Sequence, residues 1–241
     1  MNGFDDSLPE LDSAPDPRKA APEGFDSLTE NAFDFLRQAL TQLSTNPKYS
    51  LINFYTGLEL ILKARLLHEH WALVVSKPER ASRVKFQEGD FQSVNLEECI
   101  MRLQEICGES LLSEKKCFDT IRKHRNRLVH FFHPSYIGKK ARKAASEVAV
   151  EQFVGWMLIS RLLTDQWSVQ FANYSKSISE LNRLIHKNRG FLEFKYNTVK
   201  SELDKYKKSG RTIATCQSCR YPSAQLRETL IKHSDFHRSA S

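Results

Sequence analysis

Apolar residues recur at helical spacing along most of this chain. Residues 27–43, 48–75 and 144–170 each place them three or four positions apart, so that they line one face of a helix. No segment of comparable length shows the pattern of a strand. The sequence therefore predicts an all-α protein built as a helical bundle, in which each helix buries its apolar face.

Capping residues and helix breakers mark where these helices begin and end. Ser27 and Glu30 form a capping-box pattern before the first helix, and Asn95 and Glu98 form another before a short helix. Ser113 is the expected N-cap of the helix that follows. The expected helix stops are Asn46-Pro47, Gly108 and Pro134.

The helix predicted over residues 48–75 has the clearest buried face. Its expected core positions are Leu51, Phe54, Tyr55, Leu58, Ile61 and Leu62. Glu59 and Lys63, four positions apart, are expected to form an ion pair beside them. Residues 76–94 lose the apolar period, so they are predicted to form a long loop.

The chain divides into four segments. Residues 1–25 are rich in Pro, Asp, Ser and Ala, which predicts a disordered acidic arm, because such a segment cannot bury enough apolar surface to fold. Residues 26–170 form the predicted bundle. Residues 171–210 are a helical extension interrupted at Arg189-Gly190, and residues 211–241 form a tail.

The net charge of +7 is distributed unevenly. Residues 1–30 hold eight acidic and two basic side chains, whereas residues 111–145 hold ten basic and two acidic ones. Residues 171–241 hold fourteen basic and six acidic side chains. The basic regions would attract a polyanion, with an affinity that falls as salt rises. A basic surface that is only solvated is the alternative.

One predicted helix, over residues 113–134, carries polar residues that packing alone does not require. Ile121 marks its apolar face, and Arg125 falls within that face. An unpaired guanidinium among apolar side chains is strongly unfavourable, so Arg125 must be paired or must face a cleft. Asn126 and His130 lie one turn apart on another face, with His130 about 140° from Arg125.

The spacing Arg125-Asn126-x-x-x-His130 resembles the R-N-x-x-x-H signature of the HEPN superfamily, and residues 53–67 resemble the second helix of that fold. The resemblance extends over residues 26–170 and implies an antiparallel helical bundle. Many members are metal-independent ribonucleases of toxin–antitoxin and antiviral defence systems. The resemblance therefore implies an endoribonuclease that acts in defence, stress response or RNA processing and needs no cofactor for catalysis.

The resemblance also implies a role for each residue of the motif. Arg125 would hold the scissile phosphate, and Asn126 would orient the phosphate or the imidazole. His130 would transfer a proton between the ribose 2′-hydroxyl and the leaving 5′-oxygen, which leaves a 2′,3′-cyclic phosphate. Glu59 and His133 are expected to support them. Histidine suits this role because an imidazole titrates near neutral pH.

Arg125 and His130 point in different directions from one helix, and HEPN nucleases combine residues of two copies across a twofold axis. The expected partners are RNA, a second copy of the chain, and a regulatory protein such as an antitoxin. Some HEPN toxins are inactivated by nucleotide transfer onto a Tyr two residues after the His. Phe132 occupies that position here, so this form of inactivation is not expected.

A packing role for the motif is the alternative. Arg125 would then form a salt bridge with Glu59 in the core, and His130 would stabilise the C-terminal end of its helix by about 0.3 to 1 kcal/mol. The chain would in that case be a non-catalytic helical module that binds RNA or a protein. Such a module does not need a His beside a phosphate-binding Arg, and the sequence therefore favours the nuclease.

The tail places Cys216, Cys219, His233 and His237 in the order C-x2-C-x13-H-x3-H. The spacing resembles that of a two-Cys, two-His zinc finger with one extra residue in the middle. Any zinc would be structural, because four protein ligands leave no position for water. Tyr221-Pro222 interrupts the hairpin of such a finger, so a basic tail with a fortuitous C-x2-C is the alternative.

Cysteine usage and hydropathy bear on the compartment. The five cysteines do not resemble a disulfide framework, which favours a reducing environment. No run approaches the ~18 to 20 apolar residues that a membrane-spanning helix needs. A cytoplasmic protein without a membrane partner is expected.

Overall fold

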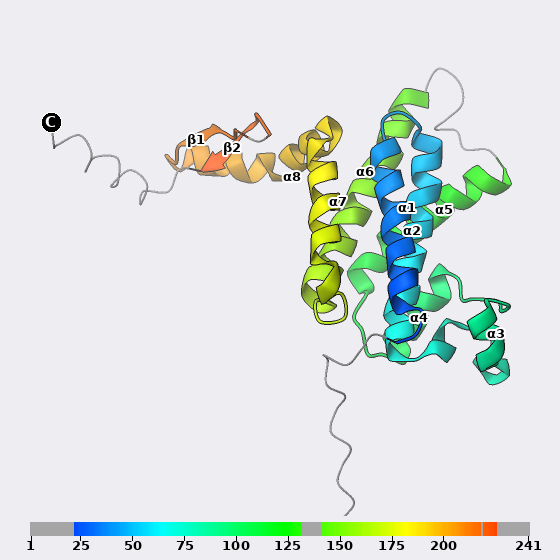
Figure 1. The fold of residues 1–241 in the computed structure, drawn as a ribbon. Helices are drawn as coiled ribbons and strands as arrows, with labels where there is room; N and C mark the ends of the chain where they lie inside the picture. Colours follow the sequence, from blue (N-terminus) through cyan, green and yellow to red (C-terminus); the bar gives the residue numbers. More distant parts are fainter. Residues whose placement is uncertain (1–21, 132–140, 218, 226–241) are drawn as a thin grey trace, which may run out of the picture.

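The computed structural model describes residues 22–131, 141–217 and 219–225. Within these ranges the protein is all-α apart from one two-stranded hairpin, which confirms the predicted fold class (Figure 1). The helices are α1 (Phe25–Gln42), α2 (Pro47–Glu69), α3 (Arg83–Glu88), α4 (Leu96–Glu105), α5 (Leu112–His130), α6 (Ala141–Arg161), α7 (Ser175–Lys187) and α8 (Arg189–Lys208), and the strands are β1 (Ile213–Thr215) and β2 (Pro222–Gln225). None of the described helices combines the length and the apolar character needed to cross a membrane.

Two long helices, α1 and α2, lie side by side at the centre of the bundle (Figure 1). They approach closely at Gly57, where an added Cβ would lie 2.6 Å from Leu36 Cγ and 3.0 Å from the Ala32 carbonyl oxygen. A side chain at this position would push the two helices apart. The predicted buried face of α2 is confirmed, since Leu51, Phe54, Tyr55, Leu58, Ile61 and Leu62 are all buried.

Helices α5 and α6 pack against α2. At Gly155 of α6 an added Cβ would lie 2.8 Å from Ile121 Cδ1 and 3.0 Å from Phe54 Cε1, so the three helices meet at this point. A buried hydrogen bond of 2.9 Å, from Ser50 Oγ to Gln152 Oε1, also joins α2 to α6. The core predicted for residues 144–170 is confirmed, since Val148, Phe153, Trp156, Ile159 and Leu163 are buried.

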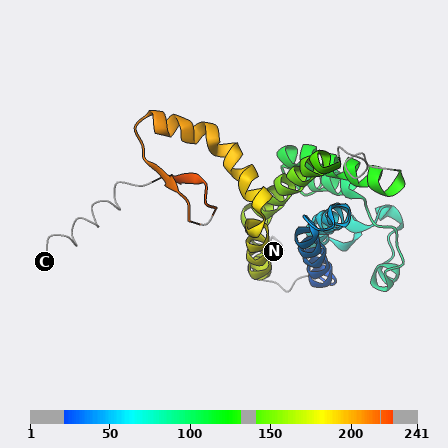
Figure 2. The same ribbon diagram turned by 90° about the horizontal axis from the view of Figure 1, so that it is seen from above.

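Helix α8 and the hairpin project away from the bundle (Figures 1 and 2). Asn188 precedes α8 and its side chain accepts a hydrogen bond from the Phe191 backbone N–H at 3.2 Å. The interruption predicted at Arg189-Gly190 therefore lies one residue earlier, because Asn188 supplies the N-cap. The rings of Tyr196 and Tyr221 stack with centres 4.7 Å apart and hold the hairpin on α8.

The start of α1 differs from the prediction. The helix begins at Phe25, its N-cap is Gly24 with a φ of 81°, and Ser27 does not cap it. Phe25 is 1% exposed and packs on the ring of Phe171, with centres 5.4 Å apart. The last residue of the predicted acidic arm, residues 1–25, thus belongs to the bundle. Burying this ring contributes about 2 kcal/mol, which exceeds the ~1 kcal/mol of a side-chain cap.

Two other helix ends differ as well. Helix α2 ends at Glu69, because Trp71–Val74 form a separate 3-10 helix. The N-cap of α5 is Leu111, which is fully buried, and Ser113 lies within the first turn without a capping bond. Helix α5 ends at His130, four residues before the predicted stop.

Residues 76–94 are more ordered than the predicted loop. They contain α3, and Val75 pairs with Ser93 in an antiparallel bridge. Helix α3 has no buried residue, so its sequence carries no apolar period from which to predict it. The capping box predicted at Asn95 and Glu98 is confirmed by reciprocal bonds of 2.8 and 3.0 Å.

Candidate functional site

Helix α5 carries the Arg-Asn-His motif, and its buried face holds it against α2. Phe118, Ile121 and Leu128 are buried, as their spacing predicts. Val129 is 46% exposed and therefore lies outside the buried face. The packing places Arg125, half-buried, next to the side of α2 that carries Tyr55.

The Arg125 guanidinium lies over the ring of Tyr55, with its central carbon 4.8 Å from the ring centre. Nη1 of Arg125 donates a hydrogen bond to Asn126 Oδ1 at 3.0 Å. Its Nε is buried and has no hydrogen-bond partner among the described residues. A ring and an amide thus hold Arg125 in place without neutralising its charge.

Glu59 does not pair with Arg125 in the described part of the chain, so the salt bridge expected for a packing role is not found there. Its carboxylate instead binds Lys63 Nζ at 2.7 Å, as the sequence predicts, and accepts a hydrogen bond from the Tyr55 hydroxyl at 2.6 Å. Lys63 Nζ also donates to Ser93 Oγ at 3.0 Å. We call the connected set the polar line, and it consists of Ser93, Lys63, Glu59, Tyr55, Arg125 and Asn126.

The sequence predicts Tyr55 only as a core position and does not identify its place in the polar line. Its burial and its hydrogen bond to Glu59 raise its pKa well above the ordinary value, so its hydroxyl stays protonated and remains a donor near neutral pH. The signal that could have identified it is the i, i+4, i+8 spacing of Tyr55, Glu59 and Lys63, which places three polar groups on one face of α2.

His130 is the last residue of α5 and is exposed. It lies in the final helical turn with Arg127, where the helix dipole favours a cation, as expected for a packing role. Among the residues that the structure describes, no hydrogen bond joins His130 to Arg125 or Asn126. Within the described residues, a hydrogen bond therefore joins Arg125 to Asn126, and His130 is not part of that contact.

Apolar side chains flank His130 on both sides in the sequence. Val129 is 46% exposed and Phe131 is 78% exposed. Large exposed apolar groups can mark a surface that a partner covers. The end of α5 therefore combines an exposed imidazole with apolar surface.

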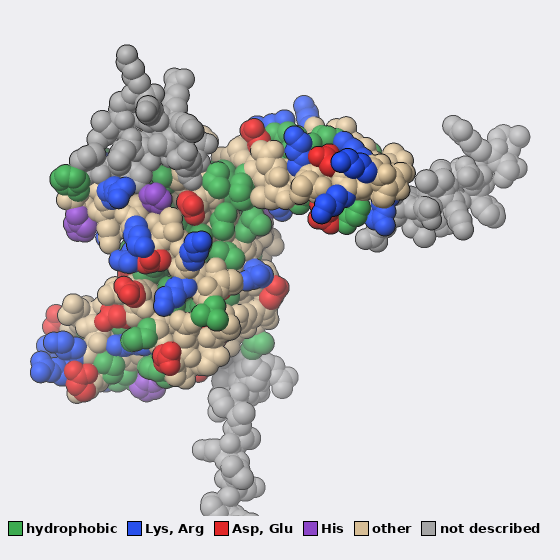
Figure 3. Space-filling model, turned by 180° about the vertical axis from the view of Figure 1, so that it is seen from behind, with side chains coloured by type: hydrophobic (Ala, Val, Ile, Leu, Met, Phe, Trp, Pro, Cys, Tyr) green, Lys and Arg blue, Asp and Glu red, His purple; other side chains and the backbone are tan. Residues whose placement is uncertain are grey.

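The surface is hollowed between the end of α5 and the segment that contains α3 (Figure 3). Between α4 and α5 lies a cavity of about 190 Å³ whose lining includes Lys115, Asp119, Arg122 and Lys123. Asp119 binds Arg122 at 2.6 Å and Lys123 at 2.9 Å, and these hydrogen bonds hold the pKa of Asp119 below its usual value. Glu97 also lines this cavity and lies 3.9 Å from Arg122, so the cavity holds three basic and two acidic side chains.

Cys216 and Cys219 lie in the loop between β1 and β2. The loop is tight, because Cys216 N donates to Tyr221 O and Arg220 N donates to Cys216 O, both at 2.8 Å, and Arg220 has a φ of 61°. Both cysteines line one cavity of about 260 Å³ against α8. A hairpin therefore forms here, although Tyr221-Pro222 was expected to interrupt it.

His233 and His237, the other two candidate zinc ligands, lie outside the described residues, as does His133, the expected supporting residue of the motif. Within the described ranges, no group of three or more His, Cys, Asp or Glu side chains is positioned to hold a metal. Two thiols on one hairpin fit half of the ligand set of a structural zinc site.

No family model, no curated protein and no solved structure matches this chain. The candidate site consists of Arg125 and its neighbours in the polar line, the exposed His130, and the basic side chains of α5.

Proposed function

We propose that this protein is a metal-independent endoribonuclease of the HEPN type. The observation that carries the proposal is the state of Arg125, which Tyr55 and Asn126 hold in place while no described carboxylate neutralises it. Arg65 offers a contrast, because this buried arginine binds Glu69 and Glu109 at 2.5 and 2.6 Å. A fixed cation that keeps its charge suits a site where negative charge develops on a phosphate.

The proposed reaction is a transesterification, in which the phosphorus exchanges its bond to the 5′-oxygen for a bond to the 2′-oxygen of the neighbouring ribose. The 2′-oxygen attacks phosphorus, the bond from phosphorus to the 5′-oxygen breaks, and the products carry a 2′,3′-cyclic phosphate and a 5′-hydroxyl. His130 accepts the proton of the 2′-hydroxyl and, once protonated, supplies it to the leaving 5′-oxygen. Arg125 stabilises the charge on the phosphate oxygens, and Asn126 keeps the guanidinium oriented.

Two copies of the chain complete the proposed site. On a straight helix His130 points about 140° away from Arg125, so one copy presents them poorly to the same phosphate. A twofold axis near the end of α5 would bring His130 of one protomer towards Arg125 of its partner. The exposed Val129 and Phe131 support this arrangement, because a second copy would bury them.

The proposal is tested by incubating purified protein with RNA in excess EDTA. The wild type should cleave and leave 2′,3′-cyclic phosphate ends, and His130→Ala should abolish cleavage with an unchanged far-UV circular dichroism spectrum. His186→Ala, which removes another exposed histidine, is the matched control and should retain activity. RNA that is bound but not cut by the wild type would instead support the non-catalytic RNA-binding module.

We further propose that the tail holds a structural zinc ion with Cys216, Cys219, His233 and His237. The support is the tight loop that carries both thiols, since thiolates are preferred zinc ligands. The zinc would stabilise the fold of the tail and take no part in cleavage.

A further inference from the structure

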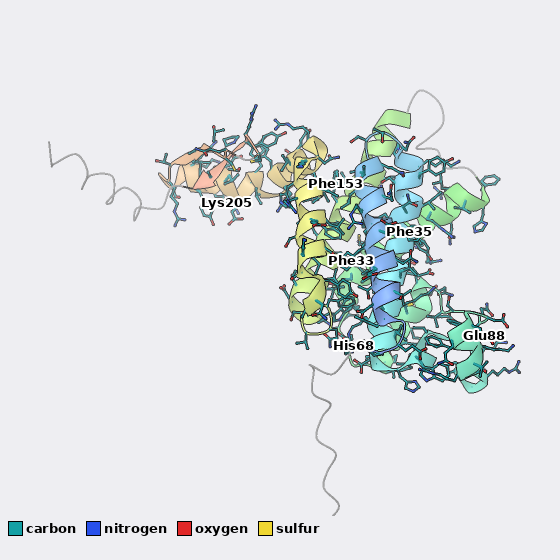
Figure 4. The ribbon with its side chains drawn as sticks, viewed as in Figure 1. Phe33, Phe35, His68, Glu88, Phe153 and Lys205 are labelled. Carbon is teal, nitrogen blue, oxygen red and sulfur yellow. The ribbon has the colours of Figure 1, made fainter. Side chains whose placement is uncertain are left out.

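A further cavity, of about 490 Å³, lies in the segment that joins α2 to α4. Helix α3 contributes to its wall, and Figure 4 shows Glu88, at the end of α3, on the opposite side of the molecule from α8. The volume is in the range of sites that bind small ligands or single residues of a polymer. The proposed reaction does not use this cavity.

Three cations and one carboxylate line the cavity. Lys77 and Arg80 form no ion pair with any residue that the structure describes. Lys85 lies 3.8 Å from Asp90, and both side chains are more than half exposed. An exposed pair of this kind contributes ~0 to 1 kcal/mol, so it does not prevent Lys85 from binding another anion.

The floor of the cavity is ordered by a buried arginine. Arg102 is 7% exposed and donates hydrogen bonds to the carbonyl oxygens of Leu73, Val75 and Ser76 at 2.8, 2.7 and 2.9 Å. Ser76 N also donates to Gln92 O at 2.8 Å. A floor that is ordered before binding loses little entropy when a ligand arrives, and the guanidinium below it adds positive charge.

An aromatic ring forms part of the wall. Phe91 lies 5.3 Å from Phe86, which in turn lies 5.3 Å from Trp71, measured between ring centres. Arg83 stacks over Trp71 and Phe86 and also pairs with Glu23, so it is committed to this cluster. The cluster keeps the Phe91 ring at the cavity, and an RNA base that stacks on such a ring gains ~1 to 3 kcal/mol.

We propose that this cavity binds one nucleotide of a single-stranded RNA substrate, with its phosphate at Lys77, Arg80 and Lys85 and its base against Phe91. The inference rests on the proposed function and adds a second, remote contact with the same substrate. The cavity combines two cations that form no ion pair with a described residue, Lys77 and Arg80, with the fixed Phe91 ring and the ordered floor.

The polar line runs from beside this cavity to Arg125, at the proposed site of cleavage. Ser93 follows directly on Gln92 of the cavity, and the line continues through Lys63 to Tyr55 and Arg125. Helix α2 rises about 12 Å between positions 55 and 63. A stacked strand advances ~3.4 Å per nucleotide, so this part of the line alone spans about four nucleotides.

The test compares two substrates, an RNA dinucleotide and an RNA of roughly twelve nucleotides, because only the longer one reaches the cavity. The double variant Lys77→Ala/Arg80→Ala removes two cations of the cavity. The matched control, Lys176→Ala/Arg183→Ala, removes two exposed cations from α7. In the full-length protein we expect the first variant to raise KM for the longer RNA roughly tenfold, with kcat and dinucleotide cleavage unchanged.

The control should change KM for the longer RNA by less than about twofold, and Phe91→Leu should raise it several-fold. Equal effects of the two double variants, or an equal effect of the cavity variant on both substrates, would overturn the inference. If the wild type cuts neither RNA, the proposed nuclease fails, and fluorescence anisotropy with the labelled longer RNA tests the cavity separately. Weaker binding by the cavity variant than by the control then supports the cavity, and equal binding refutes it.

Discussion

The guanidinium carbon of Arg125 lies 4.8 Å from the centre of the Tyr55 ring, and this contact joins the motif helix to the central pair of helices. Tyr55 donates a hydrogen bond from its hydroxyl to Glu59, and its ring stacks on Arg125. The tyrosine thus lies between the carboxylate and the guanidinium. A partly buried contact of this kind contributes about 1 to 2 kcal/mol. Arg125 therefore keeps both its orientation and its charge.

Two substitutions of Tyr55 separate the ring from the hydroxyl. Tyr55→Phe removes the hydrogen bond to Glu59, which retains Lys63, so we expect the unfolding free energy to fall by about 1 kcal/mol and cleavage to persist. Tyr55→Leu also removes the ring below Arg125, so we expect a loss of about 2 to 3 kcal/mol and at least tenfold slower cleavage. Urea titration and RNA cleavage measure both effects, and equal cleavage by the two variants would contradict a role for the ring.

Stability should fall as the pH rises above the ordinary pKa of tyrosine, 10.0. Burial, followed by the hydrogen bond to Glu59, raises the pKa of Tyr55, so the folded state favours the neutral phenol. This contribution is complete below pH 10 and is lost above it, because the unfolded chain ionises first. Urea titrations between about pH 9 and 11 should show a steeper decline for the wild type than for Tyr55→Phe.

Arg125→Lys tests whether the guanidinium itself is needed. Lysine keeps the charge but lacks the planar group that stacks on Tyr55 and binds Asn126, so we expect kcat/KM to fall roughly ten- to hundredfold without a change in fold. Arg127→Lys makes the same exchange at an exposed position of α5 and should leave kcat/KM within about twofold. Loss of helical circular dichroism in Arg125→Lys would favour the packing role.

The dimer is tested at the end of α5. Light scattering should give twice the monomer mass for the wild type, and Phe131→Glu should give the monomer mass with loss of cleavage, because it places a charge in the proposed interface. Leu112→Glu, at the opposite end of the same helix and 76% exposed, is the control and should remain dimeric.

Mixing His130→Ala with Arg125→Ala protein tests whether one site draws residues from both copies. The mixture should recover part of the activity, because one site of each mixed dimer keeps both residues. A wild-type monomer that cuts RNA would refute the shared site.

Elemental analysis should find about one zinc per chain, because structural sites bind zinc with ~10 to 16 kcal/mol in finger peptides. Cys216→Ser should release the metal and make the chain after about residue 210 sensitive to protease, while the helical bundle stays folded. Cys107→Ser, which changes a cysteine outside the hairpin, should retain the zinc. A wild-type zinc content near zero would leave the tail as a basic segment.

Thiol labelling gives a second readout of the tail. Burial raises the pKa of Cys99 and of Cys117 to about 12, so at pH 8 these thiols are almost entirely protonated and should react slowly. Cys216 and Cys219 are half-buried, and in EDTA they should be alkylated first. Added zinc should protect both, and equal labelling rates with and without zinc would contradict a metal site.

Sequence periodicity was sufficient for the helices that form the bundle. The apolar period of residues 48–67 predicts the buried face of α2, because a helix exposes its side chains in an order set by local geometry alone. Capping residues predicted the starts of the helices less reliably. Asn95 caps α4 as predicted, whereas Ser27 does not cap α1, because burial of Phe25 against distant Phe171 extends the helix.

The sequence by itself determined the all-α class, the helix that carries Arg125, Asn126 and His130, and the pairing of Glu59 with Lys63, since each depends on residues within one or two turns. Only the tertiary structure decided what Arg125 contacts. The motif and Tyr55 lie some seventy positions apart, and their contact depends on the packing of α5 against α2, which no local spacing specifies. The same reason applies to the cavity beside α3, whose floor is built by Arg102 from a different helix.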